Sequence, residues 1–95
     1  MAAYVIVDIE VTDPARYEDY KKLAGAAVEA HHGRYVARGG RTEGLSGDWS
    51  PSRLVILEFE SVEAAKAWEG SPQYTAAKKV RNEASHANMI VVEGV

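Results

Sequence analysis

Two imidazoles and two guanidinium groups are concentrated in residues 31–40, which read HHGRYVARGG. Histidine transfers protons or binds metals, and arginine holds carboxylates or phosphates. His31 falls on the apolar stripe of a predicted helix near its C-terminal end, where it either satisfies free carbonyl groups or faces a pocket. Adjacent helical histidines point about 100° apart and do not make the i,i+4 pair of a helical metal site, so no metal site is predicted.

Arg38 is followed by two glycines, but the segment is not a phosphate-binding loop because it lacks the necessary turn from a strand into a helix. The glycines indicate a bulge or a close approach of another backbone segment. Arg38 itself either pairs with an acidic neighbour or binds a carboxylate ligand.

Asp8 lies inside residues 3–11 (AYVIVDIEV), a predicted strand built mainly of valine and isoleucine. A carboxylate in such a strand must be hydrogen-bonded, ion-paired or made basic enough to serve as a general base. The open alternatives are a catalytic base, a solvated lining group, and an ion pair with Arg38 or Arg53. The candidate catalytic residues are therefore Asp8, His31 and Arg38.

Aromatic residues supply the candidate ligand-binding groups, Tyr17, Trp49 and Tyr74. Trp49 and Tyr74 flank a loop or a helix break, where a pocket mouth could lie. Trp49 stands among small polar residues, so we expect its indole to pack on another segment. Tyr17, like Tyr20 and Trp68, has the helical spacing of plain core residues. No catalytic triad order, zinc motif or nucleotide fingerprint is present, and no cofactor is predicted.

Composition restricts the class of protein. The 95 residues predict one domain over 1–95, and the formal charge of -3 with interspersed signs argues against nucleic acid as a partner. Cysteine is absent, so thiolate chemistry and disulfides are excluded. No apolar run approaches the ~20 residues that cross a membrane, and we expect a soluble, cytoplasmic protein.

The first half predicts a strand, a helix and a second strand. Pro14 after an N-cap residue type begins the helix, which runs for about 18 residues and ends at Gly33 as the left-handed residue. The next strand runs from residue 34 to about residue 42. Simple alternation places Tyr35 on one of its faces and Arg38 on the other.

The second half predicts a strand over 53–59, a helix capped by Ser61 and broken at Gly70-Ser71-Pro72, and a last strand over 88–95. The order β-α-β-β-α-β predicts an α+β ferredoxin-like sandwich, a four-stranded antiparallel sheet with helices on one face. The other face carries apolar residues such as Ile6 and Tyr4, so we expect two sheets to pack face to face in a homodimer.

The whole chain also resembles a known family. YVIVDIEVTDPARYEDYKKL, HHGRYVARGG, GDWSPSRLVILEFESVEAAKAWEGSPQY and the terminal VVEGV look like small bacterial proteins grouped as domain of unknown function 1330. That family belongs to the dimeric α/β-barrel group, similar in fold to cofactor-independent antibiotic-biosynthesis monooxygenases, haem-degrading monooxygenases and muconolactone isomerases. The resemblance implies the fold and the dimer but no established activity. This chain has His32 where glycine is common.

Two functional hypotheses follow. In the first, the protein binds a small aromatic or carboxylated molecule and acts as a cofactor-independent monooxygenase or isomerase. Asp8 is then the base, and His31 and Arg38 stabilise an oxyanion. Trp49 and Tyr74 hold the ring of the substrate. In the second, the dimer is a non-catalytic binding or structural module. The second predicts no pocket of ligand size and an Asp8 carboxylate neutralised by an arginine.

Overall fold

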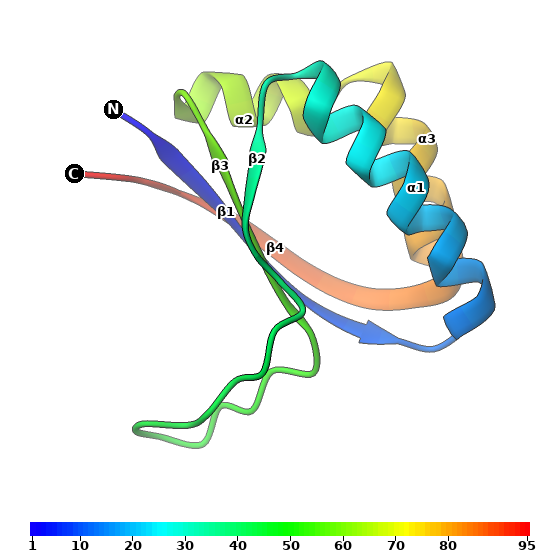
Figure 1. Cartoon of the computed structure of the whole chain (residues 1–95), viewed down its shortest axis with the longest axis vertical. Helices are drawn as coiled ribbons and strands as arrows, with labels where there is room; N and C mark the ends of the chain where they lie inside the picture. The colour runs from blue at the N-terminus through cyan, green and yellow to red at the C-terminus, as the bar shows by residue number, and fades with distance from the viewer.

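One four-stranded antiparallel sheet forms the centre of the protein. The computed structural model describes residues 1–95, with the strands in the order β2-β3-β1-β4 and all three helices on one face of the sheet (Figure 1). This is the predicted ferredoxin-like α+β fold, with the last crossover split into two helices. No helix is long and apolar enough to span a membrane. The elements are β1 (Ala3–Val11), α1 (Pro14–Ala30), β2 (Arg34–Arg38), β3 (Leu54–Phe59), α2 (Val62–Glu69), α3 (Pro72–Ala84) and β4 (Ser85–Glu93).

The covered face of the sheet supplies the core. Alternate residues of the two central strands point toward the helices, and α2 and α3 add Trp68 and Tyr74, whose rings lie 4.2 Å apart between centroids. Trp68 is 1% exposed and Tyr74 is fully buried. The buried residues of the central strands are Val5, Val7, Ile9, Val55, Leu57 and Phe59.

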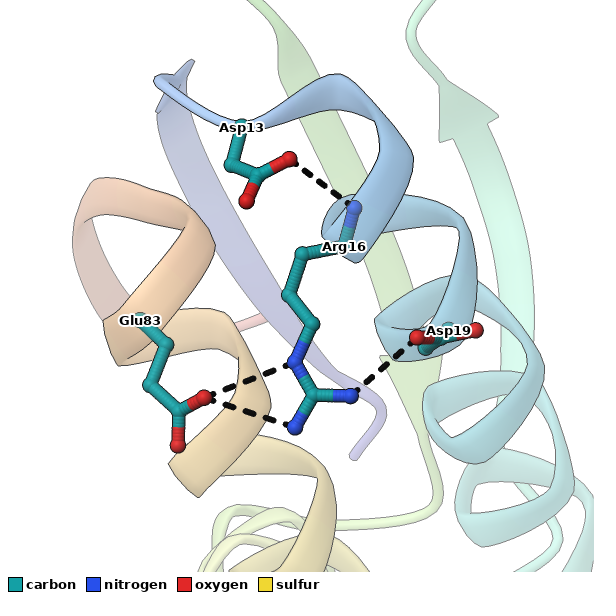
Figure 2. A network of polar contacts seen from close by, with 4 residues as sticks. All are labelled: Asp13, Arg16, Asp19 and Glu83. Atoms are coloured by element: carbon teal, nitrogen blue, oxygen red, sulfur yellow. Dashed lines mark hydrogen bonds and ion pairs between the residues drawn. The ribbon is translucent and has the colours of Figure 1, made fainter.

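Helix starts follow the predicted capping chemistry. Ser61 caps α2 and Ser71 caps α3, each accepting a backbone N–H bond with its hydroxyl oxygen. Asp13 does the same for α1 with the N–H of Arg16. The Arg16 side chain then donates to Asp19 in its own helix and to Glu83 in α3, which ties the two long helices together (Figure 2).

The open face of the sheet carries an apolar row. Ile6 pairs with Ile56 on one side and with Ile90 on the other, and Tyr4 pairs with Val92. Ile90 is 62% exposed, and no segment of the chain covers this face. The unpartnered apolar face that the sequence predicts is therefore present.

Several predicted boundaries are corrected. β2 ends at Arg38, because Gly39 turns the backbone with φ +70°, and β4 covers Ser85–Glu93 rather than 88–95. α1 ends at Ala30, and the left-handed residue is His32 (φ +59°), not Gly33. Gly33 has a different role: a Cβ atom there would lie 2.6 Å from the Phe59 ring.

A long loop joins β2 to β3. We call residues 40–51 the arm; it contains no helix or strand and extends away from the helices (Figure 1). Leu45 in the arm is 99% exposed and Trp49 is 64% exposed. The Trp49 indole contacts another segment through a hydrogen bond to Asp8 of β1, described below, while most of the residue is exposed.

Candidate functional site

An aromatic cavity lies between α1 and the covered face of the sheet. We call it the cationic pocket, because twelve of its fifteen lining residues are hydrophobic and the other three are Lys21, Arg38 and Arg53. No acidic residue lines it, and its volume of about 20 Å³ holds roughly one water molecule. The hydrophobic lining residues are Val7, Ile9, Tyr17, Tyr20, Ala24, Val28, Tyr35, Val55, Leu57, Trp68, Tyr74 and Met89.

A β-bulge places Arg38 in this pocket. The register of β2 shifts between Tyr35 and Ala37, so Arg38 pairs with the buried Val55 and points to the covered face. Its guanidinium lies 4.3 Å from the centroid of the Tyr35 ring. Simple alternation predicted Arg38 on the face opposite to Tyr35, and the bulge corrects that prediction.

Arg53 approaches the pocket from the start of β3. Its guanidinium lies 5.6 Å from the centroid of the Tyr17 ring, and its Nε is buried without a hydrogen-bond partner. The group passes so close to Gly39 that a Cβ at that position would collide with it. Gly39 therefore serves both the left-handed turn and the passage of Arg53.

The phenols of the pocket remain neutral near pH 7. Burial raises the pKa of Tyr17 and of Tyr35, and the Arg38 and Arg53 guanidinium groups offset only part of this rise. Burial also raises the pKa of Tyr20, beside the Tyr74 hydroxyl. These tyrosines can donate hydrogen bonds but cannot neutralise the arginines.

A larger groove lies beside strand β4. We call it the β4 groove; it has a volume of about 310 Å³, and seven of its ten lining residues are hydrophobic. Trp68 and Met89 line both this groove and the cationic pocket. The remaining lining residues are Val5, Ala65, Lys66, Glu69, Arg81, Ala87, Ile90 and Val91.

Two hydrogen-bond donors of the groove residues have no partner. They are Nε1 of Trp68 and Nε of Arg81, both buried. Arg81 also donates from Nη1 to the Tyr74 hydroxyl at 3.0 Å, and that hydroxyl lies 3.0 Å from the hydroxyl of Tyr20. The single carboxylate of the groove, Glu69, forms an ion pair with Lys78.

Asp8 lies on the open face of the sheet. Its carboxylate accepts a hydrogen bond from Nε1 of Trp49 and another from the backbone N–H of Ser52, both at 3.2 Å. It forms no ion pair with Arg38 or Arg53, so the pairing considered from the sequence does not occur. The contacts of Asp8 hold the base of the arm.

The predicted site residues therefore fall into three places. Tyr17, Arg38 and Tyr74 meet in the cationic pocket, whereas Asp8 and Trp49 meet on the opposite face. His31 lies at the C-cap of α1, with its Nε2 3.4 Å from Oε1 of Gln73. The predicted grouping of Asp8, His31 and Arg38 is not formed within one chain.

Sequence reasoning missed the groove residues Arg81 and Glu69 and considered Arg53 only as a partner for Asp8. Arg81 follows Tyr74 by seven residues, two helical turns, and this spacing was the available signal. No equivalent pattern marks Glu69, because its place in the groove depends on how α2 packs against β4.

The fold defines an α+β ferredoxin-like protein with pockets between its helices and its sheet. More narrowly, the chain belongs to the DUF1330 family, a domain of unknown function, whose family model matches residues 2–95. No curated protein matches the sequence significantly.

Solved structures of similar fold cover almost the whole chain. A protein of unknown function from Rhodopseudomonas palustris has 20% identity and a TM-score of 0.77 over 99% of this chain and 82% of its own. SnoaB, a cofactor-independent oxygenase from Streptomyces nogalater, has 15% identity and a TM-score of 0.71 over 99% and 93%. A dimeric protein of unknown function from Bacteroides fragilis has 16% identity and a TM-score of 0.65 over 98% and 96%.

Proposed function

We propose that this protein is a homodimer that binds a small aromatic molecule in the β4 groove and promotes cofactor-independent oxygenation or isomerisation. The observation that carries the proposal is the combination of a ligand-sized apolar groove with two unpartnered buried donors, Trp68 Nε1 and Arg81 Nε. Buried donors without partners are rare in native proteins, and a ligand oxygen would satisfy them. The fold similarity to a cofactor-independent oxygenase adds support.

Both reactions begin with the same event. A proton leaves a carbon activated by an aromatic ring and a carbonyl group, and the negative charge gathers on the carbonyl oxygen. The two N–H donors belong to residues that line the groove and would stabilise that oxyanion. Glu69 is the only carboxylate that lines the groove, and its ion pair with Lys78 must open for it to accept the proton.

The fate of the carbanion separates the two reactions. In isomerisation the proton returns to another carbon. In oxygenation the carbanion reacts with O₂, and an activated CH₂ group plus O₂ becomes a carbonyl group plus water. The substrate supplies all the electrons, so neither reaction needs a reductant.

The dimer part of the proposal rests on the open face. The row of Ile56, Ile6 and Ile90 crosses three strands, and in a twofold dimer the same row of each chain would meet its own copy. A large exposed apolar patch is a recurrent mark of a protein interface, and proteins of similar fold are described as dimeric. Sedimentation velocity tests this part directly, and a monomer at micromolar concentration contradicts it.

The chemistry is tested with 2-tetralone, whose CH₂ group is activated by a ring and a carbonyl. We expect the protein to accelerate deuterium exchange at that carbon, followed by NMR, with O₂ uptake recorded in parallel. Trp68→Phe keeps an aromatic side chain but removes the Nε1–H donor, and it should lower the exchange rate roughly 100-fold. Trp49→Phe tests whether the substrate binds instead at Asp8 and Trp49 on the open face. The proposed function is contradicted if exchange is lost in Trp49→Phe but not in Trp68→Phe, or if the native protein does not accelerate exchange.

A further inference from the structure

We propose that Arg38 and Arg53 form a second binding site, in the cationic pocket, for a small carboxylate anion. This site is distinct from the β4 groove, although Trp68 and Met89 line both, and its ligand does not depend on the reaction proposed for the groove. The carrying observation is the charge of the lining: three cations and no acidic residue in a chain with net charge -3.

The two arginines lack any counter-ion. Six ion pairs occur in the protein, and neither Arg38 nor Arg53 takes part in one, whereas the third cation of the pocket, Lys21, pairs with Glu18. Placing like charges together beside apolar walls is unfavourable unless an anion joins them. The neighbouring phenols do not supply that anion, because burial keeps them protonated at neutral pH.

The side chains are also held in place for a ligand. Each guanidinium lies over an aromatic ring, Arg38 over Tyr35 and Arg53 over Tyr17, and this cation–π contact favours its observed position. Gly39 leaves the space through which Arg53 reaches the pocket, and the buried Arg53 Nε still lacks an acceptor. A guanidinium fork presents parallel N–H donors that match the two oxygens of a carboxylate.

The size of the cavity selects the class of anion. A cavity of about 20 Å³ has room for a group about the size of one water molecule, which favours the small planar head of a carboxylate over a bulkier tetrahedral phosphate group. Arg38 is exposed, so the body of the ligand would extend outward past it. The geometry therefore points to an aromatic or aliphatic monocarboxylate bound by its head group.

The test compares benzoate with benzamide, a neutral molecule of nearly the same shape, by isothermal titration calorimetry on the intact protein. We expect saturable binding of benzoate alone, weakened by added salt. Arg53→Gln and Arg38→Gln should each weaken it roughly tenfold or more. Arg41→Gln is the matched control, since Arg41 lies on the arm and pairs only with Glu43, and it should bind as the native protein does.

Three outcomes overturn the proposal. The first is no binding of benzoate, and the second is equally strong binding of benzamide. The third is a loss of benzoate affinity in Arg41→Gln, or in Arg81→Gln, which removes the arginine of the β4 groove, that equals the loss in Arg38→Gln and Arg53→Gln. Circular dichroism checks that each variant folds, and Arg38→Gln, with an exposed side chain, keeps the test available if Arg53→Gln does not. Benzoate binding without exchange of 2-tetralone leaves this site standing and contradicts only the proposed function. Exchange of 2-tetralone without benzoate binding contradicts only the site in the cationic pocket.

Discussion

On the covered face of the sheet, Arg38 and Arg53 stand beside tyrosine rings without a carboxylate, whereas on the open face the carboxylate of Asp8 stands without an arginine. The same strands build both faces, and neighbouring residues alternate between them. The Asp8 carboxylate and the two guanidinium groups thus lie on opposite faces of the sheet. Each charge then finds a different partner: aromatic rings on one face, and N–H donors of the loop beyond β2 on the other.

The bulge in β2 produces this separation. Without the register shift after Tyr35, alternation would turn Arg38 to the open face, the face of Asp8. One extra residue in the strand therefore moves the Arg38 guanidinium from the open face into the aromatic pocket. The bulge therefore adds Arg38 to the cations Lys21 and Arg53 that already line the cationic pocket.

The most severe test of the two faces uses neighbouring residues of β1. Val7 is 2% exposed on the covered face, and Ile6 lies at the centre of the open row. Val7→Asp should unfold the chain, because an unpaired buried carboxylate costs several kcal/mol against a total stability of about 5–15 kcal/mol. Ile6→Asp should leave the chain folded but weaken the proposed dimer roughly 100-fold.

Far-ultraviolet circular dichroism and sedimentation velocity measure these two effects separately. A folded Val7→Asp protein would show that the covered face is less tightly packed than its burial indicates. An Ile6→Asp protein that stays dimeric would place the interface elsewhere.

Two glycines between β1 and β2, Gly25 inside α1 and Gly33 just before β2, sharpen the comparison at a smaller scale. Gly33→Ala places a Cβ 2.6 Å from the Phe59 ring, which is itself held by Trp68, and we expect a loss of about 1–3 kcal/mol in the free energy of unfolding. Gly25→Ala, inside α1 with nothing within 4 Å, should gain about 0.5–1 kcal/mol. Urea denaturation measures both, and equal effects would contradict the close packing at Gly33.

The fold was predictable because its signals are local. The caps at Asp13, Ser61 and Ser71, the prolines after two of them, and the valine-rich strands each determine one element, and together they allow one arrangement. The ends of the helices and strands were less predictable. The strand β2 stops at Gly39 because of a backbone turn, which the composition of residues 39–42 does not distinguish from a continued strand.

The candidate site was predictable only in part, because pockets depend on packing between elements. Arg38, Tyr17 and Tyr74 do share a pocket, although they come from three separate elements. A carboxylate among valines indicates a functional group, so the sequence suggests grouping Asp8 with Arg38. The sequence does not reveal the bulge that turns Arg38 to the opposite face of the sheet. The unpartnered donors of Trp68 and Arg81 arise from tertiary packing alone.

Alkaline pH probes the buried phenols of the covered face. Burial raises the pKa of Tyr20 above its ordinary value of 10, so at high pH the unfolded chain loses a proton that the folded chain keeps. The free energy of unfolding is therefore unaffected below about pH 10 and falls above it, by about 1.4 kcal/mol per pH unit for this residue. Thermal melts from pH 9 to 11.5 measure the slope. Tyr20→Phe should reduce it, and an unchanged slope would contradict the role of Tyr20.

The smallest effect is expected on the open face, at Asp8. Asp8→Asn keeps one acceptor oxygen and replaces the other with an NH₂ group, so one of the bonds from Trp49 and Ser52 is lost. Both bonds are partly solvated, and the loss should cost about 1 kcal/mol or less. Trp49 fluorescence should shift as the indole loses its acceptor, while benzoate binding and 2-tetralone exchange stay unchanged, because neither Asp8 nor Trp49 lines either proposed site. Loss of exchange in Asp8→Asn would instead restore Asp8 as the catalytic base and would require a second chain to bring substrate to the open face.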